Sequence, residues 1–320
     1  MSDSAFPRSA APNDLSPDEL RLRPTETGTL AVTPARAAWR YLSFRAHTMQ
    51  RDEKVRVGGS AEETAIVTLA GGVDVELDRG GSLELPGRAS VWDGLPWAAY
   101  LPPGHLGMVR ALDPARVAIA SAPASGRNAV SPEPVVIGPA QVDIEIRGAG
   151  NATRQVNHII SPDFPADRLE LVEVYTPSGN WSSWPPHKHD TDAMPNEAVL
   201  EEIYYYAFRR PEAWGLQRLY RGDGSRDATW AIRDGELVIV PDGYHPFVAI
   251  HGDDAYYLNA LAGDRRTMAC SFDPDLESIR HHWPSMEPDP RVPLVGPSSR
   301  VRSDARPAGA PAQQPRKEMD

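Results

Sequence analysis

The sequence predicts an all-β fold that is built from two β-barrel halves. The 320 residues include 32 prolines and 25 glycines, a density that disfavours long helices. Short apolar or alternating runs are separated by Gly, Pro and Asp turns about every 8–12 residues, which is typical of β-sandwiches and barrels. Residues 93–104 (DGLPWAAYLPPG) and 240–250 (VPDGYHPFVAI) share the order strand, turn, strand. This internal similarity indicates a duplicated barrel.

The expected strands occupy most of the chain between its two ends. Each run is rich in β-branched or aromatic residues and is bounded by turn-forming residues. The clearest runs lie at 64–77, 116–123, 141–148, 169–177, 201–208, 236–250 and 255–263. Helical periodicity is confined to two short segments near the ends, 16–23 and 273–283.

Composition divides the chain into four parts. Residues 1–31 and 284–320 are rich in Pro, Ala, Ser and charged residues without apolar periodicity, so we expect disordered tails there. Residues 32–149 are expected to form the first barrel. Residues 150–283 are expected to form the second.

Charge and cysteine content exclude several function classes. The net charge is −11 and no run of Lys and Arg is present, which argues against binding to nucleic acid or to an anionic membrane. The single cysteine, Cys270, rules out an internal disulfide, a cysteine-rich zinc knuckle and an iron–sulfur cluster. With no apolar stretch of about 18 residues and no signal-peptide pattern, the sequence predicts a soluble, cytoplasmic protein. A homo-oligomer is compatible with these features.

Histidines and one carboxylate mark a candidate metal site in the second half. In the run 185–190 (PPHKHD), His187 and His189 have the i, i+2 spacing that places both side chains on one face of a strand. Glu202 opens a tyrosine-rich strand, and His245 follows a Pro-x-Gly turn. An H-x-H pair alone is a weak metal signal. Three imidazoles and one carboxylate from neighbouring strands, however, form a suitable site for Zn²⁺, Mn²⁺, Fe²⁺ or Ni²⁺.

The order H-x-H…E…G-x5-P-x-G-x-H resembles the pattern of the cupin superfamily. It departs from the usual spacing, because twelve residues (DTDAMPNEAVLE) separate His189 from Glu202. Longer runs are similar to the 5-deoxy-glucuronate isomerase family of myo-inositol degradation, which is related to 5-keto-4-deoxyuronate isomerase. These runs include TPARAAWRYLSF (33–44), ASVWDGLPWAAYLPPG (89–104), LVEVYTPSGNWSSWPPHKHDTD (171–192), LEEIYYY (200–206) and YYLNALAG (256–263). The resemblance covers about residues 30–283.

The resemblance implies a bicupin, with two double-stranded β-helix (jelly-roll) barrels. It implies His187, His189, Glu202 and His245 as ligands of a divalent metal, with Zn or Mn as the first candidates and Fe or Ni as alternatives. The first half has no H-x-H and would be structural. The implied reaction is an aldose–ketose isomerisation of 5-deoxy-glucuronate to 5-dehydro-2-deoxy-gluconate, assisted by the metal through an enediolate.

Further residues are candidates for substrate binding and proton transfer. A uronate carboxylate calls for a cation, and Arg218 is the first candidate, with Arg154 and Lys188 as weaker ones. Lys188 stands between two candidate ligands and should point to the opposite strand face. Sugar hydroxyls could meet Tyr204, Tyr257 and Asn259, although tyrosines on a strand are often core residues. For the general base, the sequence leaves Glu201, Tyr244, Glu197 and Asp190 open.

Three other functions are compatible with the same ligand pattern. An iron-dependent dioxygenase would consume oxygen with a diol or phenol substrate. A 5-keto-4-deoxyuronate isomerase would prefer its own uronate in a side-by-side assay. A sugar-binding cupin without catalysis would bind 5-deoxy-glucuronate and leave it unconverted.

Overall fold

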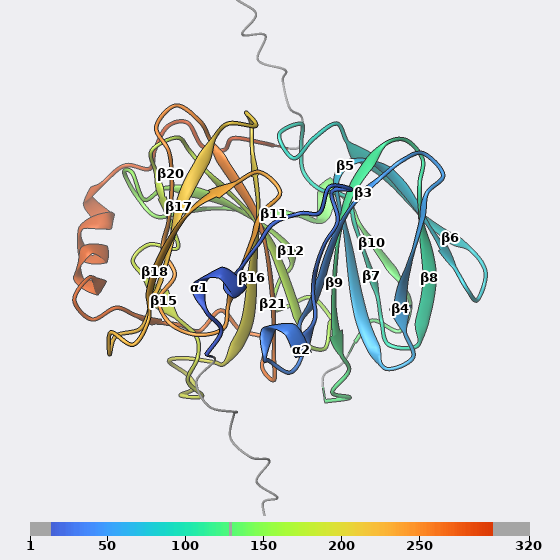
Figure 1. Cartoon of the computed structure of the whole chain (residues 1–320), viewed down its shortest axis with the longest axis horizontal. Coiled ribbons are helices and arrows are strands. Elements are labelled where there is room, and N and C mark those ends of the chain that lie inside the picture. Colours follow the sequence, from blue (N-terminus) through green and yellow to red (C-terminus); the bar gives the residue numbers. More distant parts are fainter. Residues whose placement is uncertain (1–13, 128–129, 297–320) are drawn as a thin grey trace, which may run out of the picture.

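The computed structural model describes residues 14–127 and 130–296, and β-strands are the main regular secondary structure of this part of the chain. Two β-rich halves lie side by side (Figure 1). The all-β class predicted from the sequence is therefore confirmed. The helical elements are short: α1 (Pro17–Leu20), α2 (Pro34–Ala37), and the 3₁₀ segments η1 (Pro139–Gln141) and η2 (Glu277–Ser285). No helix in the described ranges has the length and apolar character needed to cross a membrane.

The N-terminal half is one nine-stranded sheet. Its strands are β2 (Leu30–Val32), β3 (Ser43–Met49), β4 (Lys54–Gly59), β5 (Glu62–Leu77), β6 (Ser82–Arg88), β7 (Ala98–Leu101), β8 (His105–Ala111), β9 (Ala115–Pro123) and β10 (Val135–Ile137). The main path runs β10-β7-β5-β9-β3-β2, and β4, β6 and β8 join it at β5. The pairing of the long β5 with β6 shifts register between Gly71 and Val73. At Gly71, φ is +70° and a Cβ would lie 2.5 Å from the Pro114 carbonyl oxygen.

The C-terminal half contains three sheets. The largest has the order β1-β19-β16-β21-β13-β12-β11. Its strands are β1 (Arg21–Leu22), β11 (Asp143–Arg147), β12 (Arg154–Ile160), β13 (Leu169–Thr176), β16 (Leu200–Phe208), β19 (Leu237–Val240) and β21 (Ala255–Gly263). A four-stranded sheet contains β14 (Trp181–Ser182), β20 (Phe247–Ala249), β17 (Trp214–Tyr220) and β18 (Asp227–Arg233). The strands β15 (His187–Lys188) and β22 (Ser271–Phe272) form a separate pair.

The seven-stranded and four-stranded sheets of the C-terminal half pack face to face. The Tyr206 ring on β16 lies 5.0 Å from the Phe247 ring on β20, and the Ser182 and Tyr257 hydroxyls hydrogen-bond at 2.6 Å. Polar side chains thus enter the space between these sheets. That space contains the candidate site.

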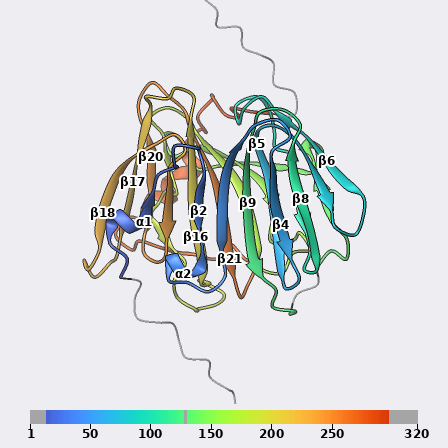
Figure 2. The same ribbon diagram turned by 45° about the vertical axis from the view of Figure 1, so that its right-hand side comes forward.

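The two halves repeat one strand order. The path β7-β5-β9-β3-β2 in the first half corresponds to β19-β16-β21-β13-β12 in the second. Figure 2 shows the strands of both halves running in similar directions. Hydrogen bonds between the described strands do not close either half into a barrel, so the structure supports the duplication at the level of sheet order.

Apolar cores lie inside the first half and between the halves. Inside the first half, Ile66, Val109 and Val117 belong to a cluster that is almost wholly buried. A larger cluster joins the two halves, with the Phe44 and Tyr205 rings 5.7 Å apart. Because this shared core buries apolar surface from both sheets, the halves stabilise each other.

A buried ion pair also joins the halves. The Arg88 guanidinium on β6 binds the Glu173 carboxylate on β13, and both side chains are almost completely buried. The Tyr256 hydroxyl donates to Glu173 at 2.8 Å, and Arg88 donates to the Tyr175 hydroxyl at 3.2 Å. Burial on its own would lower the pKa of Arg88, but the Glu173 carboxylate raises it, so the pair is charged.

The observed boundaries differ from those expected from composition. Residues 14–31 contain α1, β1 and the start of β2, although a disordered tail was expected over 1–31. Likewise, Val295 is buried and its backbone N–H donates to Gln155, although it lies in the expected tail 284–320. β11 pairs with β12, so it belongs to the second half rather than to 32–149. The remaining tail residues, 1–13 and 297–320, lie outside the described part of the chain.

Candidate active site

The C-terminal half holds a cavity of about 390 Å³. It is bordered by strands of the seven-stranded sheet, by β15 and β22, and by the η2 segment. Its polar and charged lining residues are Glu145, Arg147, Arg154, Ser183, His187, His189, Glu202, Tyr204, Asn259, Tyr257, Cys270 and Arg280.

Three of the four candidate metal ligands meet at one wall of this cavity, where His189 and Glu202 line it and His245 lies behind them. Ligand atoms of His189, Glu202 and His245 all lie within 4.8 Å of one another. His189 Nε2 is 2.7 Å and His245 Nε2 is 3.2 Å from the same carboxylate oxygen, Glu202 Oε2. His189 follows β15, Glu202 lies on β16, and His245 lies between β19 and β20. All three side chains are buried.

Backbone carbonyls fix the orientation of two of these imidazoles. His189 Nδ1 donates to the Leu200 carbonyl at 2.9 Å, and His245 Nδ1 donates to the Gly243 carbonyl at 2.9 Å. A carbonyl only accepts, so each Nδ1 carries the hydrogen and each Nε2 faces Glu202. Within the described ranges His245 Nε2 has no hydrogen-bond partner. Two imidazole nitrogens directed at one carboxylate oxygen fit a shared divalent cation.

Electrostatics in the cluster favour the ligand forms of Glu202 and His187, an ionised carboxylate and a neutral imidazole, whereas they favour the protonated form of His189. Burial alone would raise the pKa of Glu202, but His245 and His189 hold it well below its usual value. Burial alone would lower the pKa of His189, but the Glu202 carboxylate raises it. Burial and the neighbouring His245 and His189 lower the pKa of His187 well below its usual value, so that imidazole is neutral.

His187 lies beside this three-residue group. Its ring centroid is 4.7 Å from that of His245 and 6.4 Å from that of His189, and it borders the same cavity. Its Nδ1 lies 3.4 Å from the Pro185 carbonyl, which leaves Nε2 as the atom available to a metal. The structure therefore brings all four candidate ligands together, with His187 slightly apart.

Lys188 points away from the ligands, as its position between them predicts. Its ammonium binds Asp190 at 2.6 Å and Glu197 at 2.8 Å. Asp190 in turn accepts the Gly243 N–H at 2.9 Å, two residues before His245. This network ties the segment that carries the first two histidines to the turn that carries the third.

Arg154 supplies an uncompensated positive charge to the cavity. The residue is 6% exposed, and its Nη1 donates to the Ala152 and Trp184 carbonyls. Burial and the neighbouring Arg147 lower the pKa of Arg154 to about 10. Arg147 is paired with Glu145, at 2.6 Å, so Glu145 is already engaged. A buried guanidinium of this kind favours an anionic ligand.

Hydroxyl and amide groups line the cavity between the histidines and Arg154. The Ser183 and Tyr204 hydroxyls hydrogen-bond at 2.8 Å, and the Tyr257 hydroxyl is paired with Ser182. Asn259 uses its Nδ2 on the Ile203 carbonyl and keeps its side-chain oxygen available. Such groups can hydrogen-bond the hydroxyls of a sugar.

Arg218 does not reach the cavity. Its guanidinium forms a two-point ion pair with Asp227 on the exposed face of β17 and β18, and it stacks on the Tyr220 ring. The sequence does not show which sheet a strand joins, so it could not rank Arg154 above Arg218. The structure ranks Arg154 first.

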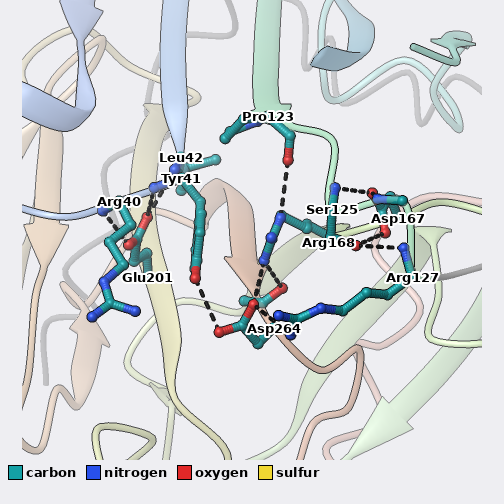
Figure 3. A network of polar contacts seen from close by, with 12 residues as sticks. Arg40, Tyr41, Leu42, Pro123, Ser125, Arg127, Asp167, Arg168, Glu201 and Asp264 are labelled. Atoms are coloured by element: carbon teal, nitrogen blue, oxygen red, sulfur yellow. Dashed lines mark hydrogen bonds and ion pairs between the residues drawn. The ribbon is translucent and has the colours of Figure 1, made fainter. Parts of the chain in front are cut away.

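The two leading candidates for the general base also face elsewhere. The Glu201 carboxylate accepts the backbone N–H groups of Arg40, Tyr41 and Leu42, which connect the halves at this point (Figure 3). Burial raises the pKa of Glu201. Tyr244 packs against the Tyr220 ring at 5.2 Å and is not among the described residues that line the cavity.

Sequence reasoning missed several residues near the site. Glu145 and Arg147 were assigned to the first half because the boundary was placed at 149, although the alternating charges of 141–148 were a signal. Arg280 was not selected, since its segment was read only as a terminal helix. Glu170 on β13 is 1% exposed, and burial raises its pKa to about 7. No sequence signal distinguishes it from other strand carboxylates.

The first half has different residues at the corresponding positions. Glu63 on β5 accepts the backbone N–H groups of residues 167–169, as Glu201 on β16 accepts those of 40–42, so these two carboxylates correspond. The next residue, Thr64, therefore stands where the second half has Glu202. Among the described residues, His189, Glu202 and His245 form the single cluster suited to a metal ion.

The chain is similar to known proteins over most of its length. The chain is 38% identical to the 5-deoxy-glucuronate isomerase of Geobacillus kaustophilus, over 81% of this chain and 92% of that protein. It is 37% identical to the Lacticaseibacillus casei enzyme of the same name, over 73% of this chain and 86% of that protein.

The structure is also similar to solved structures of other proteins. An IolB-like protein from Salmonella typhimurium superimposes with a TM-score of 0.77 at 33% identity, covering 81% of this chain and 98% of that chain. Oxalate decarboxylase from Lactobacillus farciminis shares the fold, with a TM-score of 0.55 at 14% identity, covering 79% of this chain and 88% of that chain. The model of the KduI/IolB family matches residues 18–279. The chain therefore belongs to the KduI/IolB family.

Proposed function

We propose that this protein is an aldose–ketose isomerase that converts 5-deoxy-glucuronate to 5-dehydro-2-deoxy-gluconate in myo-inositol degradation. The observation that carries the proposal is a single cavity with a metal-ligand cluster at one wall and an uncompensated buried arginine in another. An aldehyde that carries a distant carboxylate needs both features. The curated relatives named 5-deoxy-glucuronate isomerase support this substrate.

The proposed site residues divide into two groups. His187, His189, Glu202 and His245 would hold a divalent metal ion, with zinc or manganese as the first candidates. When bound, such an ion would polarise the substrate carbonyl and acidify the neighbouring C–H. In the other group, Arg154 would bind the carboxylate of the sugar. Its hydroxyls would be bound by Tyr204, Tyr257 and Asn259.

The chain's own residues would prepare the substrate for this reaction. Arg154 would hold the carboxylate, so the aldehyde would point away from it across the cavity. The apolar and aromatic walls would keep bulk water from the reacting carbons, which strengthens the electrostatic interactions there. Glu202 would keep its carboxylate ionised because the histidines hold its pKa well below its usual value.

We also propose that each half is a cupin barrel and that the first is structural. The repeated strand order and the likeness to oxalate decarboxylase support the first part. The apolar core of the first half and Thr64 at the position that corresponds to Glu202 support the second.

A coupled isomerase assay before and after chelation tests the function. We expect the purified protein to convert 5-deoxy-glucuronate, to lose turnover on chelation and to regain it when one divalent metal is added back. Oxygen consumption, measured in parallel, should be absent. Undiminished turnover in metal-free protein would refute the metal-assisted mechanism, and oxygen uptake with a diol substrate would favour a dioxygenase.

Arg154→Met should weaken substrate binding while the metal is retained. Loss of a charge-assisted contact to the carboxylate predicts a fall in kcat/KM of about 10–100-fold, carried mainly by KM. The matched control is Arg218→Met, which removes an exposed arginine paired with Asp227 and should leave kcat/KM within about twofold. The opposite ranking of the two variants would restore Arg218 as the carboxylate ligand.

A further inference from the structure

Two valines form an apolar strip beside Arg154. Val156 on β12 and Val174 on β13 are direct partners across the two strands. Both line the cavity, and they are only 2% and 5% exposed. Their side chains offer no hydrogen-bonding group to a ligand.

The position of this strip relative to Arg154 follows from the strand register. Residues i and i+2 share a face, so Val156 lies directly next to Arg154 on the cavity side of β12. Arg147 is the partner of Arg154 on β11. The Val156–Val174 pair is therefore the next pair of side chains after Arg154 along this face of β12 and β13.

The polar residues at both ends of this row are already engaged. Glu145, the partner of Val156 on β11, accepts hydrogen bonds from Arg147 and from His158 at 2.9 Å. Tyr257, the partner of Val174 on β21, shares a hydrogen bond with Ser182. A hydroxyl placed against the valines would have to compete with these existing bonds.

We propose that Val156 and Val174 select uronates that carry no hydroxyl on the carbon next to the carboxylate. This inference rests on the proposed function, in which Arg154 binds the carboxylate. In 5-deoxy-glucuronate, carbon 5 is a methylene that adjoins carboxyl carbon 6, and it would lie against the two valines. In glucuronate the same carbon carries a hydroxyl, which would lie against the two valines and would have to displace an existing hydrogen bond of Glu145 or Tyr257.

The expected preference for 5-deoxy-glucuronate can be estimated from how strongly apolar pockets reject an added hydroxyl. An apolar pocket rejects a ligand that merely adds a hydroxyl by about 10²-fold. We therefore expect wild-type kcat/KM to be about 10²-fold higher for 5-deoxy-glucuronate than for glucuronate. Part of that ratio comes from the different ring forms of the two sugars in solution, so the decisive quantity is the change in the ratio between variants.

Threonine substitutions test the inference. Val156→Thr and Val174→Thr keep the shape of the side chain and add a hydroxyl that can bond to the substrate. We expect each to lower the preference for 5-deoxy-glucuronate about tenfold relative to wild type. Val109→Thr is the matched control, because it buries the same hydroxyl in the core of the first half and should leave the preference unchanged.

A binding measurement keeps the inference separate from the isomerase activity. Gluconate and 2-deoxy-gluconate differ only in the hydroxyl next to the carboxylate, and neither is an aldehyde. We expect wild type to bind 2-deoxy-gluconate more tightly by calorimetry, and the threonine variants to reduce that difference. The same measurement serves if a variant is too slow to assay.

The outcomes distinguish the two proposals. Turnover of 5-deoxy-glucuronate with a preference that the threonine variants leave unchanged overturns the role of the valines and leaves the isomerase function intact. Absence of turnover with both uronates contradicts the proposed function, and the two gluconates then decide the role of the valines. Equal binding of gluconate and 2-deoxy-gluconate by wild type also overturns the role of the valines.

Discussion

Replacing His189 with alanine is expected to remove the bound divalent ion and isomerase turnover together. His189 Nε2 lies 2.7 Å from Glu202 Oε2, and its Nδ1 is fixed by the Leu200 carbonyl, so this imidazole is held in the orientation of a ligand. Loss of a metal that stabilises developing charge is worth several kcal/mol, which corresponds to a fall in kcat on the order of 10³-fold or more. Metal content by mass spectrometry and turnover by the coupled assay provide the measurements.

The control for this variant is His251→Ala, which removes an exposed histidine in a loop of the same half. It should retain both metal and turnover. Circular dichroism would verify that both variants are folded. Full activity of the His189→Ala protein in a metal-free preparation would contradict the role of this residue.

The second large effect concerns stability. Arg88→Met should destabilise the protein by about 3–5 kcal/mol, because it leaves the Glu173 carboxylate buried without its cation. Glu173 would retain the Tyr256 hydroxyl as a donor, which offsets only part of the loss. Urea unfolding at neutral pH, followed by tryptophan fluorescence, measures the change.

Two further variants separate the effect of the unpaired charge on stability from the effect of lost packing. Arg88→Met combined with Glu173→Gln removes both charges and should recover a large part of the lost stability. Arg51→Met breaks an exposed pair with Asp113 and should cost less than about 1 kcal/mol. A double variant that is as unstable as Arg88→Met would show that lost packing, not the unpaired carboxylate, causes the effect.

The local geometry of the ligand strands could be predicted from the sequence. The i, i+2 rule placed His187 and His189 together and turned Lys188 away, and the structure agrees on both points. The same rule puts the adjacent Glu201 and Glu202 on opposite faces of a strand, and the two carboxylates indeed face opposite sides of β16. These are properties of a single strand, which a period of two residues determines.

Positions that depend on how strands assemble could not be predicted in this way. Arg218 and Arg154 both lie on strands, but only the sheet order shows that one faces solvent and the other faces the cavity. Glu145 and Arg147 reach the cavity because β11 pairs with β12 across the expected domain boundary. Long-range pairing of this kind depends on the whole fold, and one sequence carries little trace of it.

The pairing of β1 with β19 has a consequence for synthesis of the chain. Arg21 binds Glu236, which is 215 residues later in the sequence. At about 5–20 residues per second, the ribosome needs about 10–40 s to make that stretch. During this time β1 has no partner, because β19 has not yet been made. The whole N-terminal half is therefore synthesised before β1, which precedes it in the chain, can pair. Once β19 is made, β1 would pair with it, and the two halves would complete their folding together.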